Sequence, residues 1–360
     1  MQALKLPRGP VMVDVHGFAL TAPERARLSH PLVGGVILFR RNFHTIEQLK
    51  ALTAEIRSLR TPALLVAVDH EGGRVQRFLD GFTRLPPMSV LGELWQQDAA
   101  AARAAAENVG VVLAGELRAC GIDLSFTPVL DLDWGRCAVI GNRAFHRDPQ
   151  IVSELALALQ RGLQQGGMTS CGKHFPGHGF VAGDSHFVMP QDDRTLAQLE
   201  ADDLIPFARM AAAGMGSVMP AHVVYPAVDG RPAGFSPVWL QHILRDQLQF
   251  DGVIFSDDLG MEGAAGVGGF VARAAAALDA GCDMVLVCNQ PERADEVLAG
   301  LQPPAQPRLA DRLQRMAGTG TIAGWQQQVL SADFAARQAQ VKALAIPQNV
   351  LQGPAVGEAS

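Results

Sequence analysis

Eight short apolar segments recur along the chain, each followed by polar residues and then by a longer amphipathic segment. They are rich in valine and isoleucine and do not alternate with polar residues, which is typical of strands covered on both faces by helices. They occupy residues 11–15, 34–39, 64–70, 124–131, 169–174, 216–222, 252–258 and 283–289. Alternating strands and helices indicate a parallel sheet, and eight such units predict an α/β fold closed into a (β/α)8 TIM-type barrel. An open doubly wound sheet is the alternative.

Three of the intervening segments carry helix start signals. Thr45 with Gln48 forms a capping-box pattern, while Asp148 and Ser236 each precede a proline that fits the first turn of a helix. After about residue 302 the pattern becomes helical and rich in Ala and Gln, whereas the stretch 346–360 has little to bury. We therefore expect a single barrel domain over residues 1–345, including the C-terminal helices, and a flexible tail over 346–360.

The composition excludes several classes of protein. The chain has 360 residues and a formal net charge of −6, so it offers no basic stripe for nucleic acid and no polybasic face for a membrane. Its apolar runs are far shorter than the roughly 20 residues that span a bilayer, and the N-terminus lacks the pattern of a secretory signal. The five cysteines are scattered without a CxxC pair, which is typical of reduced thiols. We expect a cytoplasmic protein with no nucleic-acid or membrane partner.

Polar residues end nearly every predicted strand. In a barrel these ends meet at one mouth, so residues far apart in sequence would share a pocket. A single polar residue at a strand end often only caps the following loop, but a whole set is harder to explain in that way. The set comprises Asp69, Glu71, Asp131, Lys173, His174, His222, Asp257, Asp258 and Asn289.

The segment "KHFPGHGFVAGDSH" at 173–186 concentrates titratable groups in a stretch that cannot be helical. A zinc site built from Cys171, His174, His178 and His186 is chemically conceivable, but the helical His-Glu-x-x-His pattern is absent and the segment is rich in glycine. An acid–base function fits better. Asp184 lies two residues before His186, so its carboxylate can orient the imidazole and favour its protonated form. We expect no metal and no organic cofactor, and we expect His178 only to hydrogen-bond within the loop.

Asp257 can supply a carboxylate nucleophile at the end of a buried strand. No G-x-S-x-G elbow and no convincing nucleophilic cysteine competes with it. Asp258 should point elsewhere, because successive strand residues face opposite sides, and a capping role suits it.

Three motifs in order give the chain a specific resemblance: "VAVDHEGGRVQRF", then "KHFPGHG" with "DSH", then "FDGVIFSDDLGMEGAA". The chain resembles the bacterial β-N-acetylglucosaminidases of glycoside hydrolase family 3, in particular the cytoplasmic branch that serves peptidoglycan recycling. The likeness covers most of the chain and implies a (β/α)8 barrel and a saccharide substrate without a cofactor. We expect the protein to be a monomer.

The resemblance also implies roles for residues at matching positions. Asp257 would be the nucleophile, and His186, oriented by Asp184, would be the general acid/base. Five further residues would hold the terminal sugar, namely Asp69, Arg77, Arg143, Lys173 and His174. Most glycosidases use two carboxylates, and this branch replaces the acid by a histidine.

The implied reaction is retaining hydrolysis of terminal N-acetylglucosamine from muropeptides, in which this sugar is linked to 1,6-anhydro-N-acetylmuramic acid with or without peptide. Two alternatives stay open: a variant that uses phosphate in place of water, and a sugar-binding barrel without catalysis. A metal-dependent hydrolase is a third reading, and chelator treatment would distinguish it.

Overall fold

A computed structural model describes residues 3–182 and 190–344 of the chain. Eight parallel strands form one sheet in the order β8-β5-β3-β2-β14-β13-β10-β9. The eight are β2 (Val11–Asp14), β3 (Val33–Leu38), β5 (Leu65–Val68), β8 (Leu124–Ser125), β9 (Cys171–Phe175), β10 (Ser217–Pro220), β13 (Val253–Asp258) and β14 (Met284–Val287). Each of the eight apolar segments in the sequence therefore overlaps one of these strands.

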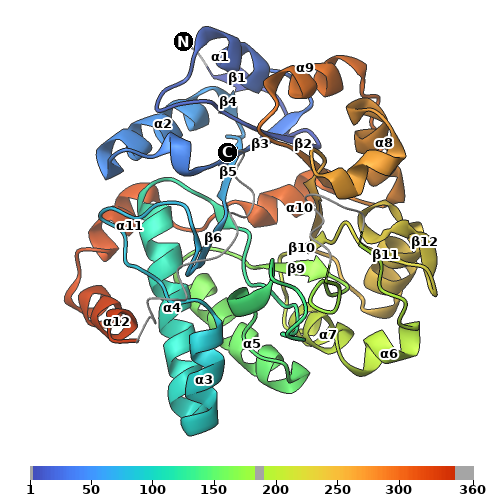
Figure 1. The fold of residues 1–360 in the computed structure, drawn as a ribbon. Helices are drawn as coiled ribbons and strands as arrows, with labels where there is room; N and C mark the ends of the chain where they lie inside the picture. Colours follow the sequence, from blue (N-terminus) through green and yellow to red (C-terminus); the bar gives the residue numbers. More distant parts are fainter. Residues whose placement is uncertain (1–2, 183–189, 345–360) are drawn as a thin grey trace.

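The sheet closes on itself between its first and last strands. Residues that follow β8 pair with β9: the Cys171 amide donates to the Thr127 carbonyl at 2.7 Å, and Val129 forms a parallel bridge with Lys173. Figure 1 shows the helices as a ring around this sheet. The prediction of a (β/α)8 barrel is confirmed, and the open doubly wound sheet is wrong.

The amphipathic segments between the strands form the helices that surround the barrel. The helices before residue 302 are α1 (Ala22–Leu28), α2 (Ile46–Ser58), α3 (Ser89–Gln97), α4 (Ala99–Ala119), α5 (Pro149–Gln165), α6 (Leu196–Ala201), α7 (Leu204–Ala212), the π-helix Val238–Gln247, α8 (Phe270–Ala280) and α9 (Pro291–Gly300). Short two-stranded sheets lie outside the eight-stranded sheet. They pair β1 (Leu4–Lys5) with β4 (Arg60–Thr61), β6 (His70–Gly72) with β7 (Val75–Gln76), and β11 (Val224–Tyr225) with β12 (Asp229–Pro232). Within the described residues, no helix has the length and hydropathy needed to cross a membrane.

The predicted helix starts are confirmed with one change. Asp148 accepts from the amides at the start of α5, and the Ser236 hydroxyl accepts from the Trp239 amide at the start of the π-helix. The Thr45 hydroxyl likewise accepts from the Gln48 amide. The Gln48 side chain, however, accepts from the His44 amide instead of completing a capping box with Thr45.

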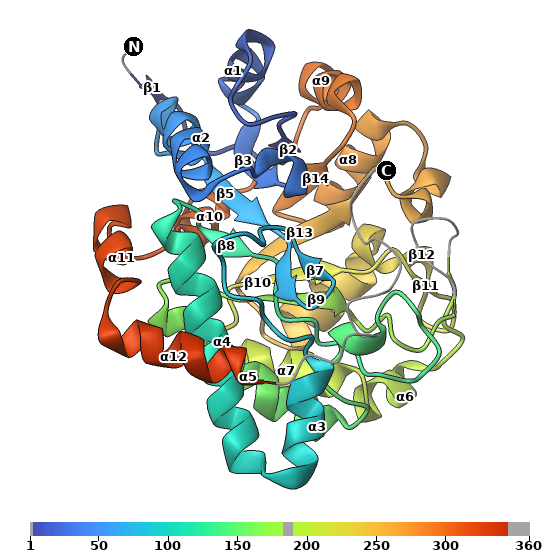
Figure 2. The same cartoon turned by 60° about the vertical axis from the view of Figure 1, so that its left-hand side comes forward.

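Strand alternation separates two apolar layers. Side chains such as Met12, Phe126 and Phe255 fill the barrel interior, whereas Val11 and Val13 pack outward against the helices. Three helices follow residue 302, as the sequence indicates: α10 (Leu309–Met316), α11 (Ile322–Gln328) and α12 (Ala332–Lys342). Leu313 and Met316 of α10 join the interior layer, while α11 and α12 lie along α4 (Figure 2). The expected tail over 346–360 lies outside the described residues.

Buried aspartates fasten the strands at the end opposite the mouth. Asp123, just before β8, accepts from the Val66 amide at 3.0 Å and pairs with Arg57 and Arg118 at 2.8 and 2.9 Å. Asp283, just before β14, accepts from the Ile254 amide in the same way and pairs with two arginines of its own. Each carboxylate thus links a strand start to its neighbour and to the helical layer.

Replacement of Asp123 by alanine should destabilise the barrel. The change leaves buried Arg118 without its carboxylate and the Val66 amide without an acceptor, so we expect the free energy of unfolding to fall by about 3–5 kcal/mol. Urea denaturation followed by circular dichroism measures the loss.

Asp295→Ala is the matched control, because it removes an aspartate that also pairs with an arginine but is 59% exposed. We expect that variant to lose at most about 1 kcal/mol. Equal losses in the two variants would show that Asp123 does not fasten the barrel.

Candidate active site

The carboxyl ends of the strands carry a buried ion cluster that centres on Glu71 in β6. Arg143 donates to both oxygens of Glu71 at 2.8 Å, and Lys173 Nζ lies 2.6 Å from Oε1 of the same carboxylate. Lys173 also donates to Asp69 at 2.9 Å, and Arg77 Nη2 lies 3.8 Å from Asp69 Oδ2. Three cations thus face two carboxylates, which leaves one positive charge in excess within this cluster.

Local structure brings these side chains together. Asp69 directly follows β5, and Lys173 lies within β9 on the far side of β8 in the sheet. Arg143 ends a short 3-10 helix, Gly141–Arg143, that starts from a glycine with φ of 42°. Arg77 follows β7. Four of the five residues expected to hold the sugar therefore share one cluster.

Mutual compensation keeps this cluster ionised. Burial alone would raise the pKa of Glu71, but the charges of Arg143 and Lys173 hold it well below its usual range. Burial would conversely lower the pKa of Lys173, and the Asp69 and Glu71 carboxylates raise it instead. Glu71 and Lys173 therefore both stay charged at neutral pH.

Asp131 organises a second cluster beside the first. Its carboxylate lies 2.7 Å from Nδ1 of His174 and accepts from the amides of His174 and His178. Burial would raise the pKa of Asp131, but His174 and His178 lower it overall. Because Asp131 occupies Nδ1 of His174, the other ring nitrogen is the one available to a ligand. His178 is buried with a pKa lowered by burial to about 4, so it is neutral at pH 7.

The two acids that end β13 have different surroundings. Asp257 is half-buried and accepts from the Asp258 amide at 2.8 Å, and its charge acts on nearby His178. Asp258 Oδ1 accepts from the amides of Gly260 and Cys288, so it caps the turn and ties β13 to β14, as the sequence indicates for this residue. Loss of solvent, reinforced by the charge of Asp257, raises the pKa of Asp258 to about 7.

A third polar cluster on the rim joins Asn289, which the sequence places at the mouth, to Asp14 and Arg41, which sequence reasoning did not assign to the site. Asp14, which ends β2, pairs with Arg41 and accepts from the Asn289 amide at 2.9 Å, while Arg41 donates to the Asn289 side chain at 2.8 Å. Asn289 has a φ of 61°, in the left-handed region. A cavity of about 210 Å³ opens beside these three residues. Asp14 ends β2 and Asp69 directly follows β5, so the signal that found Asp69, a carboxylate at the end of a short apolar run, could also have found Asp14.

Two predicted catalytic residues, Asp184 and His186, lie outside the described residues. Of the conceivable zinc ligands, Cys171 is buried in the barrel interior, whereas His174 and His178 both contact Asp131. Among the side chains that the structure describes, no three histidines, cysteines or acids are grouped so that they could hold a metal ion. The roles of Glu71 and Asp131 were missed because a strand-end position does not reveal which partner a carboxylate will meet.

Comparison with known proteins agrees with this architecture. The model of the glycosyl hydrolase family 3 N-terminal domain matches residues 8–318. A β-hexosaminidase from Chromobacterium violaceum is 73% identical over 356 residues, which cover 99% of this chain and all of that protein. A β-hexosaminidase from Neisseria meningitidis serogroup A is 63% identical over 355 residues, which cover 98% of each chain.

A similar solved structure is that of NagZ from Neisseria gonorrhoeae in complex with N-trifluoroacetyl-D-glucosamine. It shares 60% identity and a TM-score of 0.91, and the match covers 95% of this chain and 99% of that one. With a matching barrel, a matching family model and relatives of this similarity over nearly the whole chain, the protein belongs to glycosyl hydrolase family 3 and is a glycoside hydrolase.

Proposed function

We propose that this glycoside hydrolase is a retaining exo-β-N-acetylglucosaminidase acting on muropeptides. The observation that carries the proposal is the placement of Asp257, a half-buried carboxylate at the mouth end of β13. Its charge acts on His178, whose amide donates to Asp131. On its other side Asp131 holds His174, which follows Lys173 of the ion cluster. A nucleophile beside fixed charged donors and acceptors is the arrangement that a glycosyl transfer needs.

In the proposed first step an oxygen of Asp257 attacks the anomeric carbon, and the electron pair of the glycosidic bond passes to the leaving oxygen. His186, oriented by Asp184, donates the proton that this oxygen requires. In the second step His186 accepts a proton from water, whose oxygen displaces Asp257 with net retention of configuration.

The ion cluster suits the terminal sugar. Arg77, Arg143 and Lys173 offer N–H donors, and Asp69 offers acceptor oxygens, so neighbouring hydroxyls can form paired charge-assisted hydrogen bonds. His174 adds a ring nitrogen from the Asp131 cluster. The two named β-hexosaminidases and the relative bound to N-trifluoroacetyl-D-glucosamine support an N-acetylglucosamine unit at this position.

We infer the natural substrate from the resemblance to the peptidoglycan-recycling branch. It is N-acetylglucosamine linked to 1,6-anhydro-N-acetylmuramic acid, with or without peptide, and the barrel with its C-terminal helices acts on it as one monomeric catalytic domain in the cytoplasm. The reaction needs no organic cofactor and no metal, because a carboxylate and an imidazole supply the nucleophile and the proton.

Asp257→Ala should lower turnover of an aryl β-N-acetylglucosaminide by about 10³-fold or more, since it removes the nucleophile. Incubation of the native enzyme with a slow 5-fluoro N-acetylglucosaminyl substrate, followed by peptide mass spectrometry, should locate a covalent adduct on Asp257. Asp246→Ala, a change at an exposed acid, is the control and should retain full activity. An adduct on another residue would refute the assignment.

His186→Ala should impair substrates according to their leaving groups. A poor leaving group needs the proton and should lose several orders of magnitude in kcat/KM, whereas an aryl group that departs as a stable anion should lose far less. Steady-state kinetics on both substrates measures the difference. Equal losses would argue against an acid role for His186.

The same assays, carried out with and without inorganic phosphate, show whether water or phosphate accepts the sugar from the enzyme. Hydrolysis predicts free N-acetylglucosamine at a rate that phosphate leaves unchanged. A rate that rises with phosphate, together with a sugar 1-phosphate product, would favour the phosphorylase alternative.

Asp258 should make stability depend on pH. Its pKa in the folded protein, about 7, lies above the ordinary value of 3.8, so the folded state holds this proton more tightly than the unfolded chain does. The contribution is fully present below pH 4 and is lost as the pH rises through 7. Asp258→Asn keeps an oxygen for the Gly260 and Cys288 amides without ionising, so its stability relative to the native enzyme should increase from pH 5 to pH 8.

Between pH 5 and pH 8 the gain is at most about 3 kcal/mol, and less to the extent that water reaches this half-buried carboxyl. Urea denaturation at several pH values measures it, with Asp246→Asn as the exposed control. A stability difference between Asp258→Asn and the native enzyme that does not vary with pH would contradict this account.

A further inference from the structure

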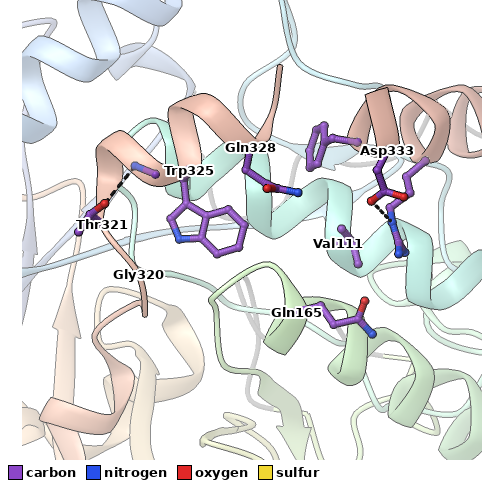
Figure 3. A pocket seen from close by; sticks show the side chains of 10 residues that line it. Val111, Gln165, Gly320, Thr321, Trp325, Gln328 and Asp333 are labelled. Carbon is purple, nitrogen blue, oxygen red and sulfur yellow. Dashed lines mark hydrogen bonds and ion pairs between the residues drawn. The ribbon is translucent and has the colours of Figure 1, made fainter. Parts of the chain in front are cut away.

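A separate cavity of about 410 Å³ lies on the flank of the molecule, where α11 and α12 meet α4 and α5. Figure 3 shows side chains from all four helices around it. It shares no residue with the three polar clusters of the mouth. One wall, from Gly320 onward, lies beyond the residues matched by the family model, whereas Val111 and Gln165 lie within that match.

Trp325 forms a fixed aromatic wall in this cavity. Its indole N–H donates to the Thr319 carbonyl at 2.8 Å, and the Thr319 amide in turn donates to the Gly167 carbonyl at 2.8 Å. Gly167 and Gly320, with φ of 78° and 74°, lie against the ring, and a β-carbon on Gly167 would approach it to 2.5 Å. The ring is only half-buried and points into the space between α11 and α5 (Figure 3).

Polar groups with planar ends surround the ring. Gln165 donates to Glu107 through its nitrogen, which leaves its carbonyl oxygen for a ligand. Gln328 is exposed, and its side chain forms no hydrogen bond with any other described residue. Asp333 pairs with Arg337 at 3.3 Å across the first turn of α12, so an acceptor and a donor stand side by side.

The combination of one aromatic ring with polar side chains fits a sugar better than a partner helix. A groove for a partner helix presents a continuous apolar stripe, whereas here only Val111 and Phe334 add apolar surface to the Trp325 ring. A sugar ring has an apolar face of C–H bonds and an edge of hydroxyls. An aromatic plate edged by amide and carboxylate groups matches both. The volume falls in the range of small-ligand pockets.

We propose that the flank cavity is a second, non-catalytic saccharide site, with Trp325 as its stacking platform and Gln165, Gln328 and Asp333 as its hydroxyl partners. Such a site would hold a hexosamine unit of a longer glycan, or a released sugar, away from the catalytic residues at the mouth of the barrel. The proposal does not rest on the reaction at Asp257, because the two sites have no residue in common.

The indole N–H resonance of Trp325 tests the proposal directly. In the Asp257→Ala enzyme labelled with ¹⁵N, titration with N-acetylglucosamine should shift this resonance saturably, with Kd in the millimolar range. Trp325→Phe assigns the resonance by its disappearance. Glycerol at equal concentration is the control for general solvent effects and should leave the resonance in place.

Two variants change the proposed site without disturbing the fold, and their activity on an aryl substrate reports that they are folded. Gln328→Ala and Asp333→Asn change exposed groups and retain the Trp325 ring, so each should weaken binding at the flank about 5-fold or more while kcat/KM on an aryl substrate stays unchanged. A Trp325 resonance that does not respond to the sugar, that responds equally to glycerol, or that titrates in both variants with the same Kd as in the parent enzyme would overturn the proposal.

A resonance that responds only to protein concentration would identify the cavity as a contact between copies of this chain and would equally overturn it. Failure here leaves the covalent adduct on Asp257 untouched. An adduct on another residue would conversely leave the Trp325 titration unaffected, so the two proposals fail separately.

Discussion

The contact of Glu71 with Arg143 and Lys173 is the interaction on which the mouth of the barrel depends. All three side chains are buried, and each charge would be strongly disfavoured without the others. Because one carboxylate serves two cations, it also fixes the distance between an arginine in a short 3-10 helix and a lysine on β9. The excess positive charge that results is held in place before any ligand arrives. Under the proposed function, these donors need little reorganisation to bind the hydroxyl groups of the sugar.

The two ends of the barrel use buried charge for opposite purposes. At the far end Asp123 and Asp283 each receive two arginines and a strand amide, so these carboxylates are saturated by protein groups. At the mouth Asp69 and Asp257 keep part of their surface exposed. Both faces of the parallel strands are packed against apolar side chains, so the charged side chains of the strands gather at the two ends of the barrel. The division between a stabilising end and a reactive end therefore follows from the direction of the strands.

Sequence reasoning predicted the barrel well because its signals are local. Each strand is a short apolar run, and the first residues of α5 and of the π-helix carry their own caps. The pairing of Glu71 with Arg143, by contrast, joins residues 72 positions apart, and no local pattern encodes it. The flank cavity was missed for the same reason, since it forms only when α11 meets a helix more than 150 residues earlier in the chain. Features that arise only from contacts between distant segments, such as this ion pair and this cavity, can be found only in the folded structure.

The paired acids of β13 show how one strand end supplies both chemistry and rigidity. The ladder between β13 and β14 shifts register between Phe255 and Asp258, so regular strand pairing is interrupted where the proposed nucleophile lies. Asp258 adds other contacts there, because its carboxyl accepts hydrogen bonds from the Gly260 amide in the turn and from the amide of Cys288, which directly follows β14. Asp257 is thereby attached to a residue that two elements hold. A carboxylate that must meet an anomeric carbon in one orientation gains more from such a rigid neighbour than from further contacts of its own.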